Sequence, residues 1–206
     1  MITIINYGSG NINAIANTYK RLKIPFNIAD NIQTLEKASK LILPGVGAFD
    51  NNMKQLNESG LRDVLDDLVK NKKIPILGIC LGLQIMAENS DEGIESGLGW
   101  VNGSVKKFNI ENIESKPKIP HMGWNSIMIH SAPELFRGVN PEVGFYFVHS
   151  YHLEVEQADD IMTTTSYGGE FVSGIHHKNI YATQFHPEKS HSNGIRLLKN
   201  FAGIQC

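Results

Sequence analysis

Apolar residues in the first half of the chain form short runs that alternate with segments of helical spacing. Residues 2–5 and 41–43 are apolar and end near glycine or proline, as buried strands do. Residues 61–70 place apolar side chains three and four positions apart, which indicates a helix with one buried face. The pattern predicts strands at 2–5, 25–29, 41–43 and 74–79, and helices from Asn11 or Asn13 to Leu22 and at 31–39, 61–70 and 81–89.

The second half of the chain has a different pattern, because strand signals dominate from residue 103 to 185. Strands are predicted at 104–108, 144–148, 161–167, 171–175 and 180–184, with a last helix near 193–201. Alternating strands and helices form a parallel sheet that is covered on both faces. We therefore expect a single α/β domain over residues 1–206, with an added antiparallel β portion.

The composition indicates which partners and which cellular compartment to expect for this protein. The formal net charge of -2 favours neither nucleic acid nor an anionic membrane as a partner. Two cysteines, Cys80 and Cys206, cannot build a disulfide framework, so a reducing compartment is expected. No basic residue precedes Lys20, which is unlike a secretory signal, and the apolar run at 74–83 is too short to cross a bilayer. We expect a cytoplasmic protein that does not associate with membranes.

Cys80 is the candidate nucleophile. It lies in Gly-Ile-Cys-Leu-Gly, between a predicted strand and a predicted helix, which is the layout of a nucleophile elbow. A helix start stabilises a thiolate, and its free N–H groups can bind an oxyanion. The alternative is that Cys80 is a small buried apolar residue, but such a residue needs no flanking glycines.

His186 and Glu188 are the candidate base and its orienting carboxylate. They follow a strand-like run, and residues i and i+2 of an extended chain face the same way. Cysteine catalysis needs a base that a third group holds in place. The alternative is a surface histidine beside a solvated carboxylate. His176-His177 could suggest a metal, but the chain has neither structural zinc spacing nor His-Glu-x-x-His, so no metal is expected.

Two glycine-rich loops are candidate anion sites. Residues 43–49 (Leu-Pro-Gly-Val-Gly-Ala-Phe) end a predicted strand and could aim a backbone N–H beside the nucleophile; the alternative is a plain turn. Gly8-Ser9-Gly10 could suggest a phosphate cradle, but Asn13 stands where a dinucleotide fingerprint needs a small residue.

The three motifs together resemble the class I (triad) glutamine amidotransferases. They are Gly-Ile-Cys-Leu-Gly-Leu-Gln at 78–84, His-Pro-Glu at 186–188 and Pro-Gly-Val-Gly at 44–47, in family order over nearly the whole chain. Residues 121–125 (His-Met-Gly-Trp-Asn), 146–151 (Tyr-Phe-Val-His-Ser-Tyr) and 7–11 look like the glutaminase subunits of imidazole glycerol phosphate synthase.

The resemblance implies a flavodoxin-like fold, glutamine hydrolysis through a thioester on Cys80, and no cofactor. It implies oxyanion donors at Val46, Gly47 and Leu81, and glutamine binding by Gln84 and by the backbone around His149, Ser150 and Tyr151. It also implies a (β/α)₈ cyclase subunit as the partner in a heterodimer, which receives the ammonia in a step of histidine biosynthesis. The expected partner-facing residues are Asn11, Met122, Trp124, Tyr146 and Lys189, although Trp124 and Tyr146 could instead be core aromatics.

Three alternatives stay open. Asn6 stands where the family usually has Asp, and Met86-Ala87-Glu88 looks somewhat like paralogues that supply ammonia for amidino-sugar synthesis in surface polysaccharides. Anthranilate or guanylate synthase glutaminases are a second alternative, but they lack the pattern at 147–151. A catalytically inactive flavodoxin-like interaction module is the third, and it would normally have lost a triad residue.

Overall fold

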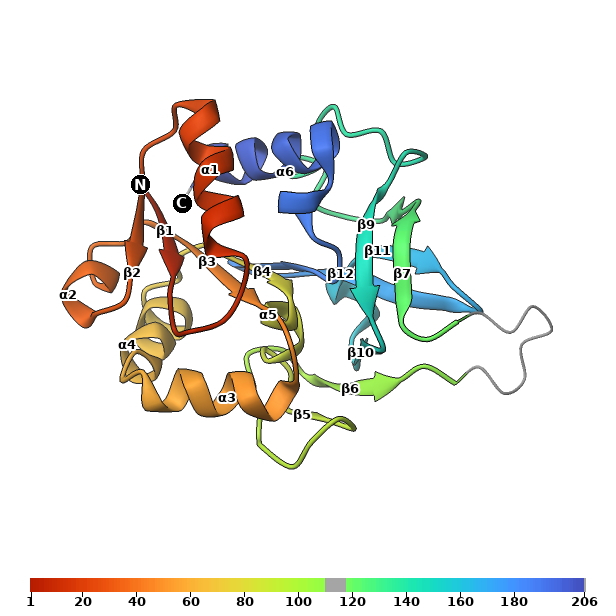
Figure 1. Cartoon of the computed structure of the whole chain (residues 1–206), viewed down its shortest axis with the longest axis horizontal. Coiled ribbons are helices and arrows are strands. Elements are labelled where there is room, and N and C mark those ends of the chain that lie inside the picture. The colour runs from red at the N-terminus through yellow and green to blue at the C-terminus, as the bar shows by residue number, and fades with distance from the viewer. Residues whose placement is uncertain (110–117, 206) are drawn as a thin grey trace.

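A large mixed sheet runs through the middle of the molecule (Figure 1). The structure is a computed structural model, and it describes residues 1–109 and 118–205. Cys206 lies outside the described residues. The N-terminal half of the sheet is parallel, in the order β2-β1-β3-β4-β13. Its strands are β2 (Phe26–Ala29), β1 (Ile2–Ile5), β3 (Lys40–Gly45), β4 (Ile76–Cys80) and β13 (Ile180–Thr183). This order is the doubly wound, flavodoxin-like one that the motifs implied.

The predicted antiparallel portion continues the same sheet beyond β13. The order runs on through β12, β10, β6 and β5, and β11 and β8 pair at one side. The bounds are β12 (Glu170–His177), β10 (Tyr151–Val155), β6 (Gly103–Lys107), β5 (Asn89–Ser90), β11 (Ile161–Ser166) and β8 (Met128–Ile129). A separate antiparallel pair joins β7 (His121–Asn125) to β9 (Phe145–His149).

Helices cover both faces of the parallel strands (Figure 1). On one face lie α1 (Ile12–Leu22) and α6 (His191–Gly203), and on the other α3 (Phe49–Glu58) and α4 (Arg62–Asp66). Each face has its own hydrophobic core, because the strands send side chains alternately to both sides. A short helix α2 (Ile32–Leu35) follows β2. None of the described helices is long and apolar enough to span a membrane.

The helix predicted at 81–89 is much shorter than its pattern suggests. Only α5 (Leu81–Gln84) is α-helical. The chain beyond it bonds to residues 97–101 instead, with Leu98 N–H donating to the Ile85 carbonyl (2.8 Å) and Trp100 N–H to the Met86 carbonyl (2.9 Å). These tertiary hydrogen bonds replace the helical ones and end the helix.

Helix α3 and strands β7 and β10 are among the elements that the sequence pattern did not predict. Helix α3 is rich in Asn, which is a weak helix former, although its buried Phe49, Met53 and Leu56 have helical spacing. Strands β7 and β10 contain His, Gly, Trp and Glu and show little apolar alternation. The predicted helix at 61–70 divides into α4 and a π-helical turn at Asp67–Asn71.

The parallel strands bring distant segments to one edge of the sheet. Ser9 follows β1, Val46 follows β3, Cys80 ends β4 and His186 follows β13. The carboxyl ends of parallel strands meet at one edge, beside the point where the strand order reverses, which is where ligands bind in such sheets.

Candidate active site

Cys80 occupies a strained turn between β4 and α5. Its φ of 55° and ψ of −109° lie outside the regions that side chains normally allow. The flanking glycines leave the room that this turn needs: a Cβ on Gly82 would lie 1.9 Å from the Leu43 carbonyl oxygen, and one on Gly78 would lie 2.8 Å from the Met86 methyl group. The turn therefore holds the Cys80 side chain in a backbone conformation that an ordinary turn would not give it.

The sulfur of Cys80 is nearly buried but reaches a pocket. The exposed fraction of the whole Cys80 residue is 7%, and the residue lines the pocket. The thiol faces the Val148 carbonyl oxygen at 4.0 Å, and the Gln184 side-chain Nε2 lies 3.7 Å from the sulfur. Two polar groups therefore lie near the thiol, although Cys80 also belongs to the hydrophobic core on one face of the sheet.

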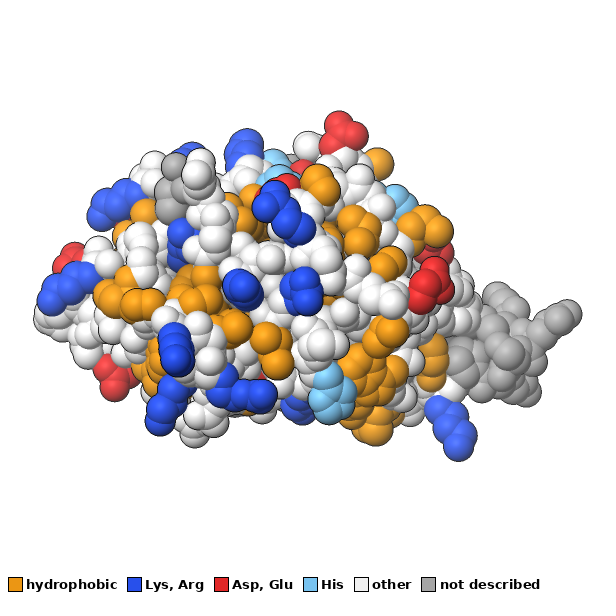
Figure 2. Space-filling view, turned by 90° about the horizontal axis from the view of Figure 1, so that it is seen from above, with side chains coloured by type: hydrophobic (Ala, Val, Ile, Leu, Met, Phe, Trp, Pro, Cys, Tyr) orange, Lys and Arg blue, Asp and Glu red, His pale blue; other side chains and the backbone are white. Residues whose placement is uncertain are grey.

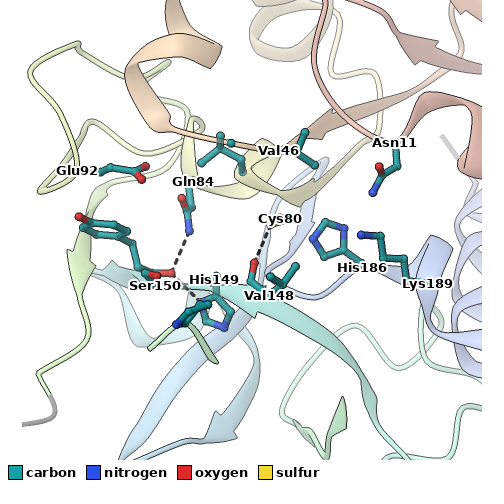
Figure 3. Close-up of a pocket in the computed structure, with 14 residues that line it drawn as sticks. Asn11, Val46, Cys80, Gln84, Glu92, Val148, His149, Ser150, His186 and Lys189 are labelled. Carbon is teal, nitrogen blue, oxygen red and sulfur yellow. Dashed lines mark hydrogen bonds between the residues drawn. The ribbon is translucent and has the colours of Figure 1, made fainter. Parts of the chain in front are cut away.

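His186 and Glu188 form a buried pair at the same pocket. Imidazole Nδ1 lies 2.8 Å from Glu188 Oε1, and Asn11 Nδ2 donates to the same oxygen at 2.8 Å. Backbone N–H of His186 donates to the Tyr146 carbonyl, which fixes the approach of this segment. Among the described residues, Nε2 of His186 has no hydrogen-bond partner. Figure 3 shows the imidazole beside Cys80, so this free nitrogen is the one available to the sulfur.

The charges of the site favour a protonated imidazole and an ionised carboxylate. Burial opposes protonation of His186, but the Cys80 and Glu188 side chains outweigh it and raise the pKa of His186 to about 10. Burial by itself would raise the pKa of Glu188, but bonding to His186 and Asn11 lowers it below the ordinary value. A carboxylate that holds the imidazole by Nδ1–H leaves Nε2 to exchange protons with sulfur and substrate.

The loop after β3 is held by side chains that face away from the pocket. Val46 N–H lies 3.1 Å from Ser9 Oγ, and the Val46 carbonyl accepts from Ser9 Oγ (3.1 Å) and Asn52 Nδ2 (2.8 Å). The N–H of Val46 is therefore engaged in this conformation. Gly47 has a φ of 89° and open space around it, and Leu81 N–H stands at the start of α5, where no helical acceptor exists. The oxyanion assignments stay predictions.

The pocket has a volume of about 470 Å³, in the range of small-molecule sites. The four residues predicted to bind substrate all line it, namely Gln84, His149, Ser150 and Tyr151. Figure 3 shows Gln84 and Glu92 on one side of Cys80, and His186 and Lys189 on the other. A ligand across the thiol would thus have an acidic group at one end and the base at the other.

Comparison with known proteins agrees with this geometry. The model of the family described as glutamine amidotransferase class-I matches residues 3–204. This chain belongs to the class-I glutamine amidotransferases. Relatives named imidazole glycerol phosphate synthase subunit HisH include one from Leptospira borgpetersenii, 48% identical over 204 residues, and one from Bdellovibrio bacteriovorus, 49% identical over 205; each match covers 99% of this chain and 100% of the relative.

Solved structures support the amidotransferase fold. A crystal structure of a glutamine amidotransferase covers 98% of this chain and 99% of its own, with a TM-score of 0.71 and 18% identity. Another glutamine amidotransferase, from Thermotoga maritima, covers 91% of this chain and 75% of its own, with a TM-score of 0.63 and 18% identity. At these identities the likeness shows the fold alone.

The residues predicted to face a partner lie near the pocket rim or on β7 and β9. Met122 is 61% exposed and Trp124 44% exposed, so this amidotransferase does not use Trp124 as a core aromatic. Lys189 Nζ lies 5.8 Å from the ring centre of Tyr146, while Asn11 bonds to Glu188. Figure 2 shows hydrophobic side chains in a patch toward the lower right of this face, and others over its left half. The interface itself remains a prediction.

His149, which lines the pocket, forms a buried pair with His121. His121 Nδ1 lies 2.9 Å from His149 Nε2, and His149 Nδ1 lies 2.8 Å from the Tyr151 carbonyl oxygen. A carbonyl only accepts, so Nδ1 of His149 carries a proton and Nε2 accepts from His121. Burial lowers the pKa of His149 to about 3 and that of His121 to about 4, so both rings are neutral at physiological pH.

His176 and His177, the candidate metal ligands, form hydrogen bonds with other protein groups. His177 Nδ1 lies 2.8 Å from Asp160, and His176 Nε2 bonds to the Lys178 carbonyl at 2.9 Å. Within residues 1–109 and 118–205, no three His, Cys, Asp or Glu side chains are grouped so that they could hold a metal ion.

Sequence reasoning missed three residues of the site. Glu92 lines the pocket from a loop without a recognisable pattern. Ser9 lies in the loop considered for phosphate, and it instead bonds to Val46. Gln184 stands two residues before His186, so the same i, i+2 argument that paired His186 with Glu188 could have found it.

Proposed function

We propose that this chain is the glutaminase subunit of an imidazole glycerol phosphate synthase, which hydrolyses glutamine and passes the ammonia to a partner subunit. Full-length relatives that carry this name support the assignment. The observation that carries the glutaminase chemistry is a cysteine in a strained elbow that shares one pocket with a buried His–Glu pair.

The reaction begins when the Cys80 sulfur attacks the side-chain amide carbon of glutamine. The sulfur attacks as the thiolate, because its proton already lies on Nε2 of His186, and that proton then goes to the departing ammonia. Glu188 holds the imidazole by its Nδ1–H at 2.8 Å. Water next attacks the γ-glutamyl thioester with His186 as base, and the thiolate leaves. N–H groups of Leu81 and of the Val46–Gly47 loop stabilise the oxyanion of each tetrahedral intermediate; losing one such donor typically costs about 10²–10³ in rate.

Glutamine lies across the thiol with its amide toward His186. The α-ammonium group pairs with the Glu92 carboxylate at the other end of the pocket, where Figure 3 shows this side chain. Gln84 has both Nε2 protons engaged, by the Tyr151 carbonyl and by Gln184, so its Oε1 is the atom left for the substrate. Backbone groups of residues 148–151 complete the wall.

Ammonia released into water would be protonated and would cease to be a nucleophile. The chain therefore delivers it through a dry passage to a (β/α)₈ cyclase subunit in a cytoplasmic heterodimer. The partner covers the exposed Met122 and Trp124 on β7. It also reaches Asn11 and Lys189, which line the pocket, and Tyr146 beside Lys189. Asn11 bonds directly to Glu188, so this contact would couple partner binding to the triad.

A mechanism-based alkylator tests the chemistry. A diazoketone analogue of glutamine should modify Cys80 once per chain, and peptide mass spectrometry should place the added mass there. Excess glutamine should slow the modification. Cys80→Ala should be unlabelled and inactive while it stays folded by circular dichroism, and Cys206→Ser should label normally. Glutamine hydrolysis by the Cys80→Ala variant would refute the nucleophile assignment.

A second experiment tests the biological role. The chain should capture a (β/α)₈ partner encoded in the same genome, and glutaminase turnover should rise when that partner binds its nucleotide ligand. Expression of both chains should rescue a histidine auxotroph that lacks the synthase. Activity without rescue would favour the alternative of a polysaccharide paralogue, and equal full turnover by the isolated chain would contradict the coupling.

A further inference from the structure

Gln184 is a buried polar residue beside the nucleophile, and it has no role in the triad. Its side chain is fully buried, and Nε2 lies 3.7 Å from the Cys80 sulfur. The residue directly follows β13, and its N–H donates to the Ser173 carbonyl at 2.9 Å, which anchors the backbone. Because Gln184 and His186 are two residues apart in extended chain, β13 delivers both side chains to the same sulfur.

The hydrogen-bond network fixes which atom of the Gln184 amide faces the sulfur. The Tyr151 carbonyl only accepts, so the Gln84 group at 3.0 Å from it must be the NH₂. The same NH₂ lies 3.0 Å from Gln184, whose atom there must therefore be the carbonyl oxygen. The Gln184 NH₂ then points to Cys80, and rotating this amide would bring two NH₂ groups together.

A fixed N–H donor at sulfur has a definite chemical effect. Hydrogen bonds to a charged acceptor are about twice as strong as those to a neutral one, so the donor favours thiolate over thiol. The donor is buried and oriented by its neighbours, so it needs no rearrangement when the charge develops. The Val148 carbonyl, 4.0 Å from the sulfur, accepts from the thiol but offers nothing to the thiolate.

We propose that Gln184 is a catalytic residue, whose side-chain N–H bonds to the Cys80 sulfur and stabilises the thiolate whenever it forms. This role rests on the proposed glutaminase function. It operates twice in each turnover. The thiolate first forms when the S–H proton moves to His186 Nε2, before the C–S bond forms and the C–N bond breaks. It forms again after water adds to the thioester, when the C–S bond breaks and the sulfur recovers its electron pair beside Gln184.

The test measures the sulfur directly and does not require glutamine. The rate of Cys80 alkylation by iodoacetamide is followed against pH in the full chain carrying Cys206→Ser, with the modified peptide quantified by mass. Gln184→Glu retains an oxygen that accepts from Gln84 but places an acceptor against the sulfur. We expect the midpoint of the profile to move up by about one pH unit.

Two further variants separate this effect from general disruption of β13. Gln184→Met removes both polar atoms at similar size, and it should also move the midpoint upward. Thr183→Val removes a neighbouring buried hydrogen bond, from Thr183 Oγ1 to the Phe185 carbonyl, without touching the sulfur, and it should keep the parent profile. Parent-like profiles for both folded Gln184 variants would overturn the proposal.

A measurement on the unsubstituted side chain covers the case in which the Gln184 variants do not fold. In ¹⁵N-glutamine-labelled protein, one side-chain amide should titrate with the alkylation midpoint, and this titration should vanish in Cys80→Ala. If no glutamine amide follows that midpoint, the proposal fails. Should the parent chain show the expected titration but hydrolyse no glutamine, the sulfur contact would stand and the proposed function would fail.

Discussion

The strained backbone at Cys80 makes an unusual prediction about stability. A side chain at φ 55° and ψ −109° lies far from the left-handed helical well, whereas glycine adopts such angles freely. Cys80→Gly should therefore be more stable than Cys80→Ala, although both lose the nucleophile. At an ordinary buried position the order is the reverse, because alanine restricts the unfolded chain and fills space.

The size of the effect follows from three contributions. Relieving strain at Cys80 gains roughly 3 kcal/mol, the upper end for such residues, because ψ is far from any allowed well. Glycine's freedom in the unfolded state costs about 1 kcal/mol, and the lost Cβ costs about 0.8 kcal/mol. The net advantage of Cys80→Gly over Cys80→Ala is about 1 kcal/mol, which raises the melting temperature by about 2–4 °C in a chain of this length.

Thermal and urea unfolding, followed by circular dichroism, measure this difference. Ala182→Gly is the matched control, because Ala182 is fully buried on the neighbouring β13 and is not among the residues with positive φ. This control should lose about 1 kcal/mol or more. If Cys80→Gly melts below Cys80→Ala by a similar amount, the elbow stores no strain and the reasoning is wrong.

Three other predictions test the surroundings of the thiol. Burial lowers the pKa of His149 to about 3, so below pH 6.5 the unfolded chain binds more protons than the folded one. The free energy of unfolding should therefore fall as the pH drops below 6.5, by about 2 kcal/mol at pH 5 from this group. In urea unfolding measured against pH, His149→Gln should show a smaller fall over this range. Ser9→Ala frees the Val46 N–H and should increase glutamine hydrolysis by the chain without its partner, measured as glutamate formed; an unchanged or lower rate would contradict the idea that Ser9 restrains this donor. Glu188→Gln should lower kcat by roughly 10²-fold or more with little change in KM, because His186 loses the charge that holds it; near-normal kcat would refute the role of the carboxylate.

The parallel core, and the placing of Cys80 and His186 in one pocket with Glu188 bonded to the imidazole, follow from the sequence for clear physical reasons. Apolar runs followed by glycine identify β1, β3 and β4, and the glycines around Cys80 have a local cause in the close approach of Leu43. His186 and Glu188 were recognisable because an i, i+2 pair in extended chain needs no long-range information.

The features that the sequence did not predict, such as the early end of α5, depend on contacts between distant segments. Helix α5 ends early because residues 85–88 bond to residues 97–101, and no local pattern records that pairing. The bond between Ser9 and Val46 joins the ends of β1 and β3, and the contact between Gln184 and Cys80 joins β13 to β4. Such contacts follow from strand order, which composition and periodicity do not specify.

The position of β13 in the chain has a consequence for biosynthesis. Gln184 and Cys80 are 104 residues apart, and every strand of the parallel core except β13 is made before the antiparallel portion begins. A ribosome-bound chain that has already exposed its cysteine still lacks its amide donor and its base. If Gln184, His186 and Glu188 have the roles proposed above, the nascent polypeptide cannot consume glutamine until translation has passed residue 188.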